Sequence, residues 1–154
     1  MAFLSSMNIV ASGLTAQQLR LDVVAENITN ATTTRTENGE GAYRRKMVVF
    51  QAEAGRDDFR AAMARAAGEA VPNGADPNAG GVKVTQIVED PSPMKMVYDP
   101  THPDANEDGY VEMPNVDTVK EMTDAMAATQ AYAANVTAFN ALKQVVAKGL
   151  EIGR

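Results

Sequence analysis

The carboxyl-terminal stretch, residues 116–154, decides the fold: VDTVKEMTDAMAATQAYAANVTAFNALKQVVAKGLEIGR. Apolar and small side chains recur along it at alternating intervals of three and four residues, the spacing of a helix face that packs against another helix. The residues of this stripe are Met122, Ala125, Thr129, Tyr132, Val136, Phe139, Lys143, Val146 and Leu150. The pattern predicts one long helix after Pro114, with Thr118-Val119-Lys120-Glu121 as a capping box and Gly153 as the stop signal.

A second stripe runs beside the first and is formed by Val119, Met126, Ala133 and Leu142. A helix that faces a single neighbour needs only one apolar stripe. We therefore expect this helix to be buried between several helices, either from the same chain or from identical copies.

The amino-terminal end carries the same spacing. Its stripe consists of Leu4, Met7, Ala11, Leu14, Gln18, Leu21, Ala25 and Ile28. The spacing predicts a helix over about residues 5–29, with Ser5 or Ser6 as its N-cap. The two terminal helices can pair only if the middle of the chain folds back, so an antiparallel or side-by-side bundle is expected.

The middle of the chain differs in character. Residues 30–41 are polar and rich in Thr, Asn and Gly, which indicates a loop. The sequence then predicts strands at 42–53, 81–90, 95–98 and 110–113. Residues 54–80 contain a stretch that suits a short helix, followed by a mobile loop.

These patterns together predict an α+β fold, in which long terminal helices form a coiled-coil-like bundle with a small β-rich insertion between them. The expected domains are 1–34, 35–113 and 114–154.

The composition excludes several classes of protein. A formal charge of −6 argues against nucleic-acid binding, because phosphate affinity needs clustered Lys and Arg. Without cysteine the 154 residues offer no disulfide, no thiolate nucleophile and no cysteine-bound zinc. No apolar run reaches the roughly 18 residues of a membrane-spanning helix. The amino-terminal end also lacks the basic leader of a cleaved secretory signal, so we expect neither membrane insertion nor signal-peptide cleavage.

Residues 99–111, DPTHPDANEDGYV, contain the first half of a calcium-binding loop. Asp104, Asn106 and Asp108 have the spacing of the first three ligands, Gly109 would make the turn, and Tyr110 would add its carbonyl.

The rest of that motif is missing. The twelfth position is Asn115 instead of a bidentate glutamate, and a strand instead of a helix is expected to follow. A turn in which Asp, Asn and Gly satisfy their own backbone is the favoured interpretation. A calcium-responsive binding module centred on 99–115, with Glu112 completing an irregular site, stays open as the alternative.

His102, the single histidine, lies between prolines without a nucleophile or an orienting partner nearby in sequence. We therefore expect no catalytic residues, no cofactor and no enzymatic activity, and we expect His102 to pack or hydrogen-bond locally. Four asparagines within or near the apolar stripes have another use, because buried polar groups often fix the register between helices. They are Asn27, Asn30, Asn135 and Asn140.

Both ends of the chain resemble bacterial flagellar rod and hook proteins. Residues 25–36, AENITNATTTRT, are similar to the family's amino-terminal signature at Ala25, Asn27, Ile28, Asn30 and Thr33, and depart from it at Glu26 and Thr29. At the other end the matching residues are Val116, Glu121, Met122, Ala131, Tyr132, Asn135, Leu150, Ile152 and Gly153.

The middle of the chain resembles, more narrowly, the proximal rod proteins of the C type. Residues 98–111 reproduce nearly completely a run that is the hallmark of that family. The motif residues there are Tyr98, Asp99, Pro100, His102, Pro103, Gly109 and Tyr110.

The resemblance implies a structural subunit of the flagellar basal-body rod, which crosses the periplasm and transmits torque. Another axial subunit of the hook or rod stays open as an alternative. It implies a helical tube whose inner layer consists of both terminal helices, with the chain itself and neighbouring rod proteins as partners. It also implies export through the flagellar type III gate, for which Phe3 and Met7 resemble a short recognition motif. The residues expected at the assembly interface are Leu4, Met7, Leu14, Leu21, Ile28, Met122, Met126, Tyr132, Val136, Phe139, Val146 and Leu150.

Overall fold

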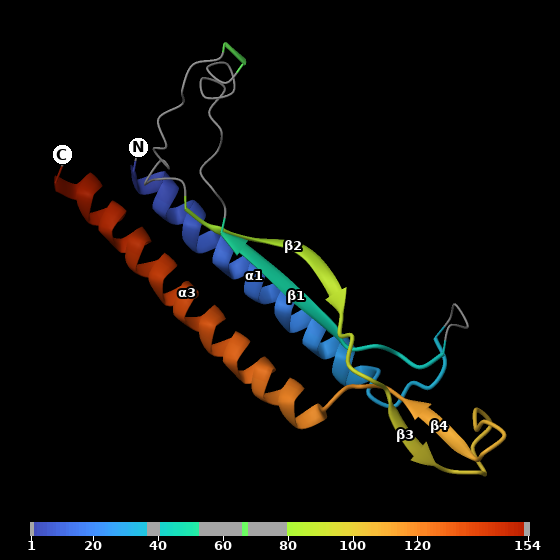
Figure 1. Ribbon diagram of the computed structural model, residues 1–154. Coiled ribbons are helices and arrows are strands. Elements are labelled where there is room, and N and C mark those ends of the chain that lie inside the picture. The colour runs from blue at the N-terminus through green and yellow to red at the C-terminus, as the bar shows by residue number, and fades with distance from the viewer. Residues whose placement is uncertain (1, 37–40, 53–65, 68–79, 153–154) are drawn as a thin grey trace. The chain divides into compact units, whose positions relative to one another are not determined.

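The computed structural model describes residues 2–36, 41–52, 66–67 and 80–152, and the side chains of 5–151 within those ranges. Along the chain lie helix α1 (Ala2–Thr29), strands β1 (Lys46–Ala52), β2 (Val82–Glu89), β3 (Lys95–Tyr98) and β4 (Tyr110–Met113), and helix α3 (Thr118–Ile152) (Figure 1). The predicted α+β class is confirmed. The short helix expected within 54–80 lies almost entirely outside the described residues. No helix in the described part of the chain has the length and apolarity needed to cross a membrane.

The four strands form two small sheets. β1 pairs with β2, and their arrows run in opposite directions in Figure 1. β3 and β4 form an antiparallel hairpin in which Met96 faces Glu112 and Tyr98 faces Tyr110.

The strand predicted at 42–53 begins later, at Lys46. Residues before it use their backbone groups on loops: Tyr43 N–H donates to the carbonyl of Thr33 at 3.1 Å, and Arg45 N–H donates to Asn115 Oδ1 at 2.8 Å. These two N–H groups are therefore not available to a partner strand, although the Arg45 carbonyl still accepts from Asp90 N–H at 2.8 Å, just beyond the end of β2.

Both predicted helix starts need correction. α1 already begins at Ala2, so Ser5 and Ser6 lie inside the helix and the N-cap prediction is wrong. Neither Pro nor Gly lies between Ala2 and Ser5 to stop the helix from extending.

The predicted capping box at Thr118 is also wrong. Asp117 caps α3, because its Oδ1 accepts a hydrogen bond from Val119 N–H at 3.1 Å and its carbonyl accepts from Glu121 N–H at 2.9 Å. The Glu121 carboxylate is therefore free to bind elsewhere.

The chain divides into two compact units that each take part of both long helices. Unit 1 comprises Met1–Ala16, Phe50–Thr85 and Tyr132–Arg154, and unit 2 comprises Gln17–Val49 and Gln86–Ala131. These units group residues that lie close in space, whereas the expected domains are continuous stretches of sequence. The two divisions cannot be compared directly, so the expected domain boundaries stay a prediction.

In unit 1, α1 and α3 come close at Gly13. A Cβ atom added at Gly13 would lie 2.9 Å from Asn135 Nδ2, so the missing side chain is what leaves room for the Asn135 amide. Next to it, Ser12 Oγ donates to the carbonyl of Ile9 at 2.7 Å and accepts from Val82 N–H at 3.1 Å. This bond ties the start of β2 to α1.

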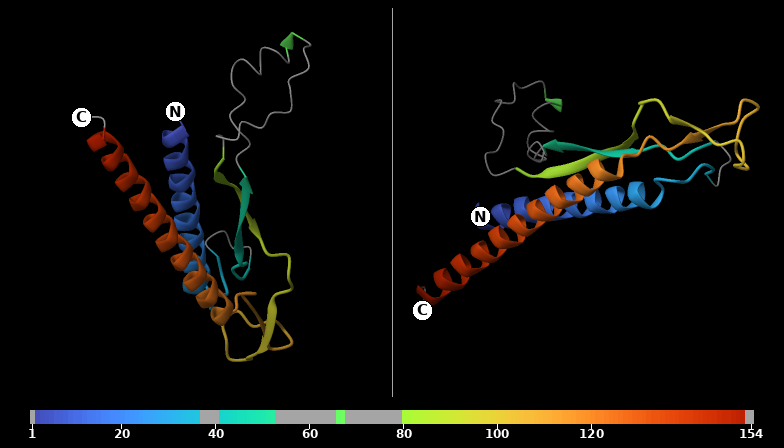
Figure 2. Two further views of the ribbon diagram at one scale, coloured as in Figure 1. Left: turned by 90° about the vertical axis from the view of Figure 1, so that its left-hand side faces the viewer. Right: turned by 90° about the horizontal axis from the view of Figure 1, so that it is seen from below.

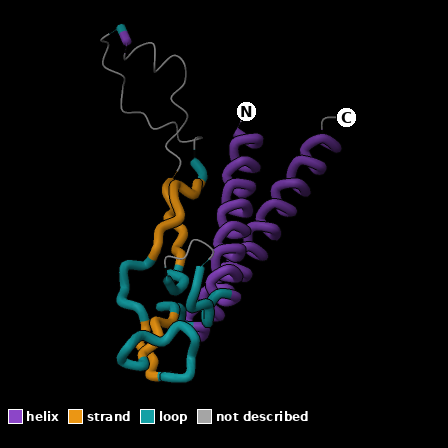
Figure 3. Tube along the Cα trace, turned by 90° about the vertical axis from the view of Figure 1, so that its right-hand side faces the viewer, coloured by secondary structure: helices purple, strands orange, loops and turns teal. Residues whose placement is uncertain are grey.

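Unit 2 holds most of the buried apolar side chains, and its strands and loops lie on one side of its own parts of α1 and α3 (Figures 2 and 3). The buried apolar residues of this unit are Val23, Val24, Tyr43, Val111, Pro114, Val116 and Ala128. Small and branched side chains dominate this core and let the backbones approach closely. The larger side chains of the predicted α1 stripe, Leu14, Leu21 and Ile28, are only half-buried.

Candidate functional site

A cluster of polar side chains lies inside the core of unit 2. We call it the Asn27 cluster; it consists of Asn27, Tyr43, Arg45 and Glu121. Asn27 is 1% exposed and Glu121 is fully buried. These two residues come from the end of α1 and the first turn of α3.

Asn27 uses all the hydrogen-bonding capacity of its amide. Nδ2 donates to Glu121 Oε2 at 2.9 Å and to the carbonyl of Lys46 at 2.8 Å. Oδ1 accepts from Tyr43 Oη at 3.0 Å and from Lys46 N–H at 2.9 Å. An amide has two donors and two acceptor positions, so this side chain has no capacity left for another partner.

Arg45 neutralises the buried carboxylate. Its Nε donates to Glu121 Oε1 at 2.6 Å, and Nη1 lies 3.4 Å from Asp90 Oδ2. Burial lowers the pKa of Arg45, but the hydrogen bonds and charges of Glu121 and Asp90 outweigh it and raise the pKa above its usual value. The guanidinium is charged at every ordinary pH.

Tyr43 is held as a hydrogen-bond donor. Burial, and then the negative charges of Glu26 and Glu121, raise the pKa of its hydroxyl far above the usual value. The phenol therefore keeps the proton that it donates to Asn27.

The cluster joins three segments that lie far apart in the sequence: the end of α1, the approach to β1 and the start of α3. Buried ion pairs add little net stability compared with apolar packing, but they cost much energy when one partner is lost. The cluster is therefore suited to fixing one alignment of α1 relative to α3.

Sequence reasoning named Asn27 as a register-fixing residue but missed the role of Glu121. The capping-box pattern accounted for Glu121 with a bond to its own helix. The available signal was Asp117, a good N-cap residue one position earlier, together with Ala128, which lies seven residues after Glu121 on the same helix face.

Residues 99–110 bond mostly to one another, as the turn interpretation expects. Asp99 Oδ1 accepts from the backbone and the hydroxyl of Thr101 at 3.1 and 2.7 Å. Asn106 Oδ1 accepts from Asp108 N–H and Tyr110 N–H at 3.1 and 2.8 Å. His102 Nδ1 accepts from Asp104 N–H at 3.1 Å, which confirms the expected local hydrogen bond of the histidine.

Asp104 fastens this turn to the loop after α1. Thr34 Oγ1 donates to its Oδ2 at 2.8 Å, and the Arg35 guanidinium pairs with Oδ1. The Thr34 hydrogen bond, and after it the charge of Arg35, hold the pKa of Asp104 below its usual range.

These bonds already occupy two of the proposed calcium ligands, Asp104 and Asn106. Within the described ranges no group of three or more His, Cys, Asp and Glu side chains is arranged to hold a metal ion. The calcium-module hypothesis stays a prediction, which calorimetry of the chain with calcium tests.

The start of α3 exposes apolar side chains, and one of them, Val119, lines an open groove together with Arg45 of the Asn27 cluster. Val119 is 71% exposed, Met122 is 55% exposed and Met126 is 61% exposed. Large exposed apolar side chains that lie together are typical of protein contact surfaces.

The residues predicted for the assembly interface fall into three groups. Met122, Met126, Val136 and Leu150 are exposed. Half-buried positions are Met7, Leu14, Leu21, Ile28, Tyr132, Phe139 and Val146. The side chain of Leu4 lies outside the described residues, as does that of Phe3, which was predicted for export recognition.

Comparison with known proteins places both ends of the chain in flagellar families. Residues 7–35 match a family described as flagella basal body rod protein, and residues 107–152 match one described as flagellar basal body rod FlgEFG protein C-terminal. The Asn27 cluster links these two matched segments, because Asn27 lies in the first and Glu121 in the second.

Curated relatives match over nearly the whole length. The flagellar basal-body rod protein FlgC of Bacillus subtilis (strain 168) is 47% identical over 152 residues, which is 97% of each chain. The chain belongs to the FlgC family. Other FlgC relatives are those of Borreliella burgdorferi, at 41% identity over 99% of this chain and 98% of the relative, and of Salmonella typhimurium, at 40% over the full length of both. The resemblance predicted from residues 98–111 is thereby confirmed, whereas the roles expected for individual FlgC motif residues stay predictions.

Proposed function

We propose that this chain is a structural subunit of the flagellar basal-body rod and polymerises helically through its two long helices. The observation that carries the proposal is the exposed stripe of Val119, Met122 and Met126, on a helix whose Glu121 is already buried within the subunit. The relatives named as rod proteins cover the same length of chain, which supports the same role here.

Helical growth follows from the type of contact. When two different surfaces of identical subunits meet, each added subunit offers the same free surface to the next one. If the rotation between neighbouring subunits does not return to the first subunit, the contact generates a helical filament instead of a ring. A rod that transmits torque also needs helices that do not slide within the subunit. The hydrogen bond between Asn27 and Glu121 resists sliding, because a shift by one turn would break it and leave a buried donor and a buried acceptor without each other.

The subunit reaches its site in the basal body by export. We propose that the flagellar type III system carries it unfolded, with Phe3 and Met7 as a recognition motif, and that the rod it joins crosses the periplasm. The mechanism is mechanical and involves no catalytic step.

Charged substitutions in α1 test the assembly role. Leu14→Asp and Leu21→Asp place a charge on half-buried positions and should block rod assembly and swimming. Asn8→Asp, at an exposed position of the same helix, is the matched control and should swim normally.

Detection of each variant outside the cytoplasm separates a failure of export from a failure of assembly. Normal swimming of both leucine variants would contradict the proposal.

A further inference from the structure

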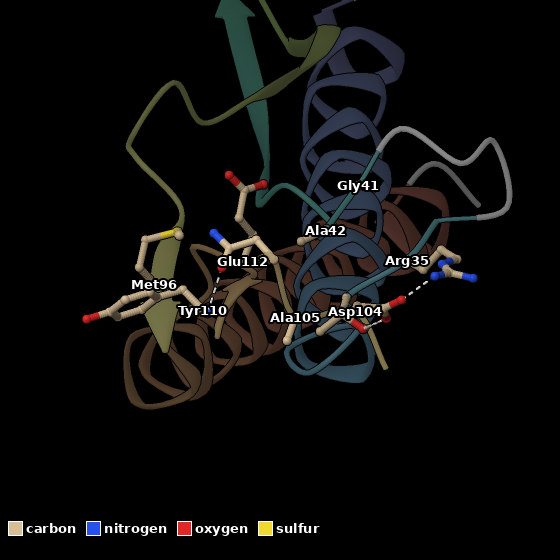
Figure 4. Close-up of a pocket in the computed structure, with 10 residues that line it drawn as sticks. Arg35, Gly41, Ala42, Met96, Asp104, Ala105, Tyr110 and Glu112 are labelled. Atoms are coloured by element: carbon tan, nitrogen blue, oxygen red, sulfur yellow. Dashed lines mark hydrogen bonds and ion pairs between the residues drawn. The ribbon is translucent and has the colours of Figure 1, made fainter. Parts of the chain in front are cut away.

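Unit 2 contains an open groove of about 390 Å³ beside the β3–β4 hairpin. Figure 4 shows Met96, Tyr110 and Glu112 of the hairpin on one side of it, and Ala105 and Asp104 of the turn that joins β3 to β4 on the other. The hairpin side supplies an apolar surface, and Glu112 places a carboxylate at its edge.

The register of the hairpin explains why this face is available. Met96 and Glu112 pair directly, as do Tyr98 and Tyr110, so all four side chains lie on one face of the hairpin. On the opposite face Val111 of β4 is 2% exposed, whereas its partner Val97 of β3 is 43% exposed, so only the β4 side of that face is packed into the unit.

The available face is mostly apolar. Met96, Tyr98 and Tyr110 are 52%, 64% and 42% exposed. A two-stranded hairpin is only marginally stable in water, so covering this face would stabilise it.

The start of α3 has the complementary features. Val119, Met122 and Met126 follow the spacing i, i+3, i+7, which is the anchor pattern of a helix that binds in a groove. Lys120 lies at the edge of this stripe and is the only Lys or Arg between residues 118 and 142. Within the part of the chain that the structure describes, neither Lys120 nor Glu112 has an ion-pair partner.

We propose that the groove binds the first turns of α3 from a second copy of the chain, with Lys120 of one copy paired to Glu112 of the other. Methionine and aromatic side chains pack well together, so Met122 suits the surface formed by Met96 and Tyr110. Because groove and helix are different surfaces on every copy, the contact repeats from copy to copy. The inference rests on the proposed assembly function and names the two surfaces that meet.

Introduced cysteines test the contact, because the chain has none of its own. Glu112→Cys and Lys120→Cys are placed in separate copies that are produced together in cells assembling rods, and the rods are then oxidised. The expected product is a disulfide-linked dimer that forms only when both variants are present.

The matched control replaces Lys120→Cys by Lys143→Cys, an exposed position 23 residues later on α3 (143 − 120), roughly 35 Å away along the helix. An equal yield of dimer from the control pair would overturn the proposal, as would its absence from both. A disulfide to a rod protein of different size would overturn the proposal that a second copy of the chain occupies the groove.

Charge reversal gives an independent readout. Glu112→Lys and Lys120→Glu should each reduce the rod-assembled chain on the order of tenfold, because each places like charges opposite one another. The two reversals combined should restore assembly.

Normal assembly of both single variants would overturn the groove contact while leaving the rod function intact. Failure of the rod function itself appears separately, as normal swimming of the Leu14→Asp and Leu21→Asp variants.

Discussion

At the scale of single residues, Asn27 is placed where substitution is most costly. Asn27→Ala would leave the Glu121 carboxylate, the Tyr43 hydroxyl and the Lys46 backbone each short of a buried partner. We expect a loss of about 3 kcal/mol in the free energy of unfolding, measured by urea denaturation of the purified chain. Asn8→Ala, at an exposed position of the same helix, should change it by less than about 0.5 kcal/mol. A loss below about 1 kcal/mol for Asn27→Ala would contradict this role.

Asp104 gives a prediction about pH. Its pKa is lowered in the folded chain, first by the Thr34 hydrogen bond and then by Arg35. The ionised Asp104 carboxylate therefore contributes its full stabilisation above the ordinary aspartate pKa of about 3.9. That contribution is lost as the pH falls through the lower pKa that Asp104 has in the folded chain.

Thr34→Val removes the hydroxyl and should move the Asp104 midpoint upward, toward 3.9, in a carboxyl NMR titration. Thr32→Val is the control, because Thr32 is exposed in the same loop, and should leave the midpoint unchanged. An unmoved midpoint in Thr34→Val would assign the shift to Arg35 instead.

At the scale of elements, the start of α3 depends on Asp117. Asp117→Ala removes the side chain that accepts from Val119 N–H and should cost about 1 kcal/mol of stability, measured by thermal or chemical denaturation. Thr118→Ala should cost much less, because the cap lies one residue earlier. A larger loss of stability for Thr118→Ala than for Asp117→Ala would instead support the capping box predicted from the sequence.

The two helices and the hairpin strands were predictable because their signals are local. Apolar spacing indicated α1 and α3, and alternation indicated β3 at Lys95–Tyr98 and β4 at Tyr110–Met113. Ends of elements were less predictable, because distant partners decide them. β1 begins at Lys46 since Arg45 N–H donates to Asn115, seventy residues away in sequence.

The candidate site was predictable only in part for the same reason. Asn27 is visible in the sequence as a polar residue in an apolar stripe. Its partners Tyr43, Arg45 and Glu121 come from three other places in the chain, and no local pattern pairs them. Likewise, the exposure of Met122 depends on which face of α3 the Asn27 cluster occupies, which the spacing of the stripe leaves open.

At the scale of the whole molecule, assembly should change which methionines are accessible. Met122 and Met126 are exposed in the single chain and should be oxidised readily by dilute peroxide. In assembled rods we expect both to be protected, by roughly tenfold or more in rate, if each stripe is covered by a neighbour. Mass spectrometry of the tryptic peptides measures both states. Equal oxidation rates in free chain and rods would show that another face of α3 forms the contact.

The separation of the Asn27 cluster along the chain has a consequence for the order of folding. Glu121 lies 94 residues after Asn27, so a chain that emerges amino end first presents α1 long before its carboxylate partner is available. Until then one donor of the Asn27 amide lacks its protein partner and stays hydrated, which discourages the amino-terminal segment from docking on an incorrect apolar surface. Completion of the Asn27 cluster therefore waits until most of the polypeptide has emerged, a delay that would suit the proposed export of the unfolded chain.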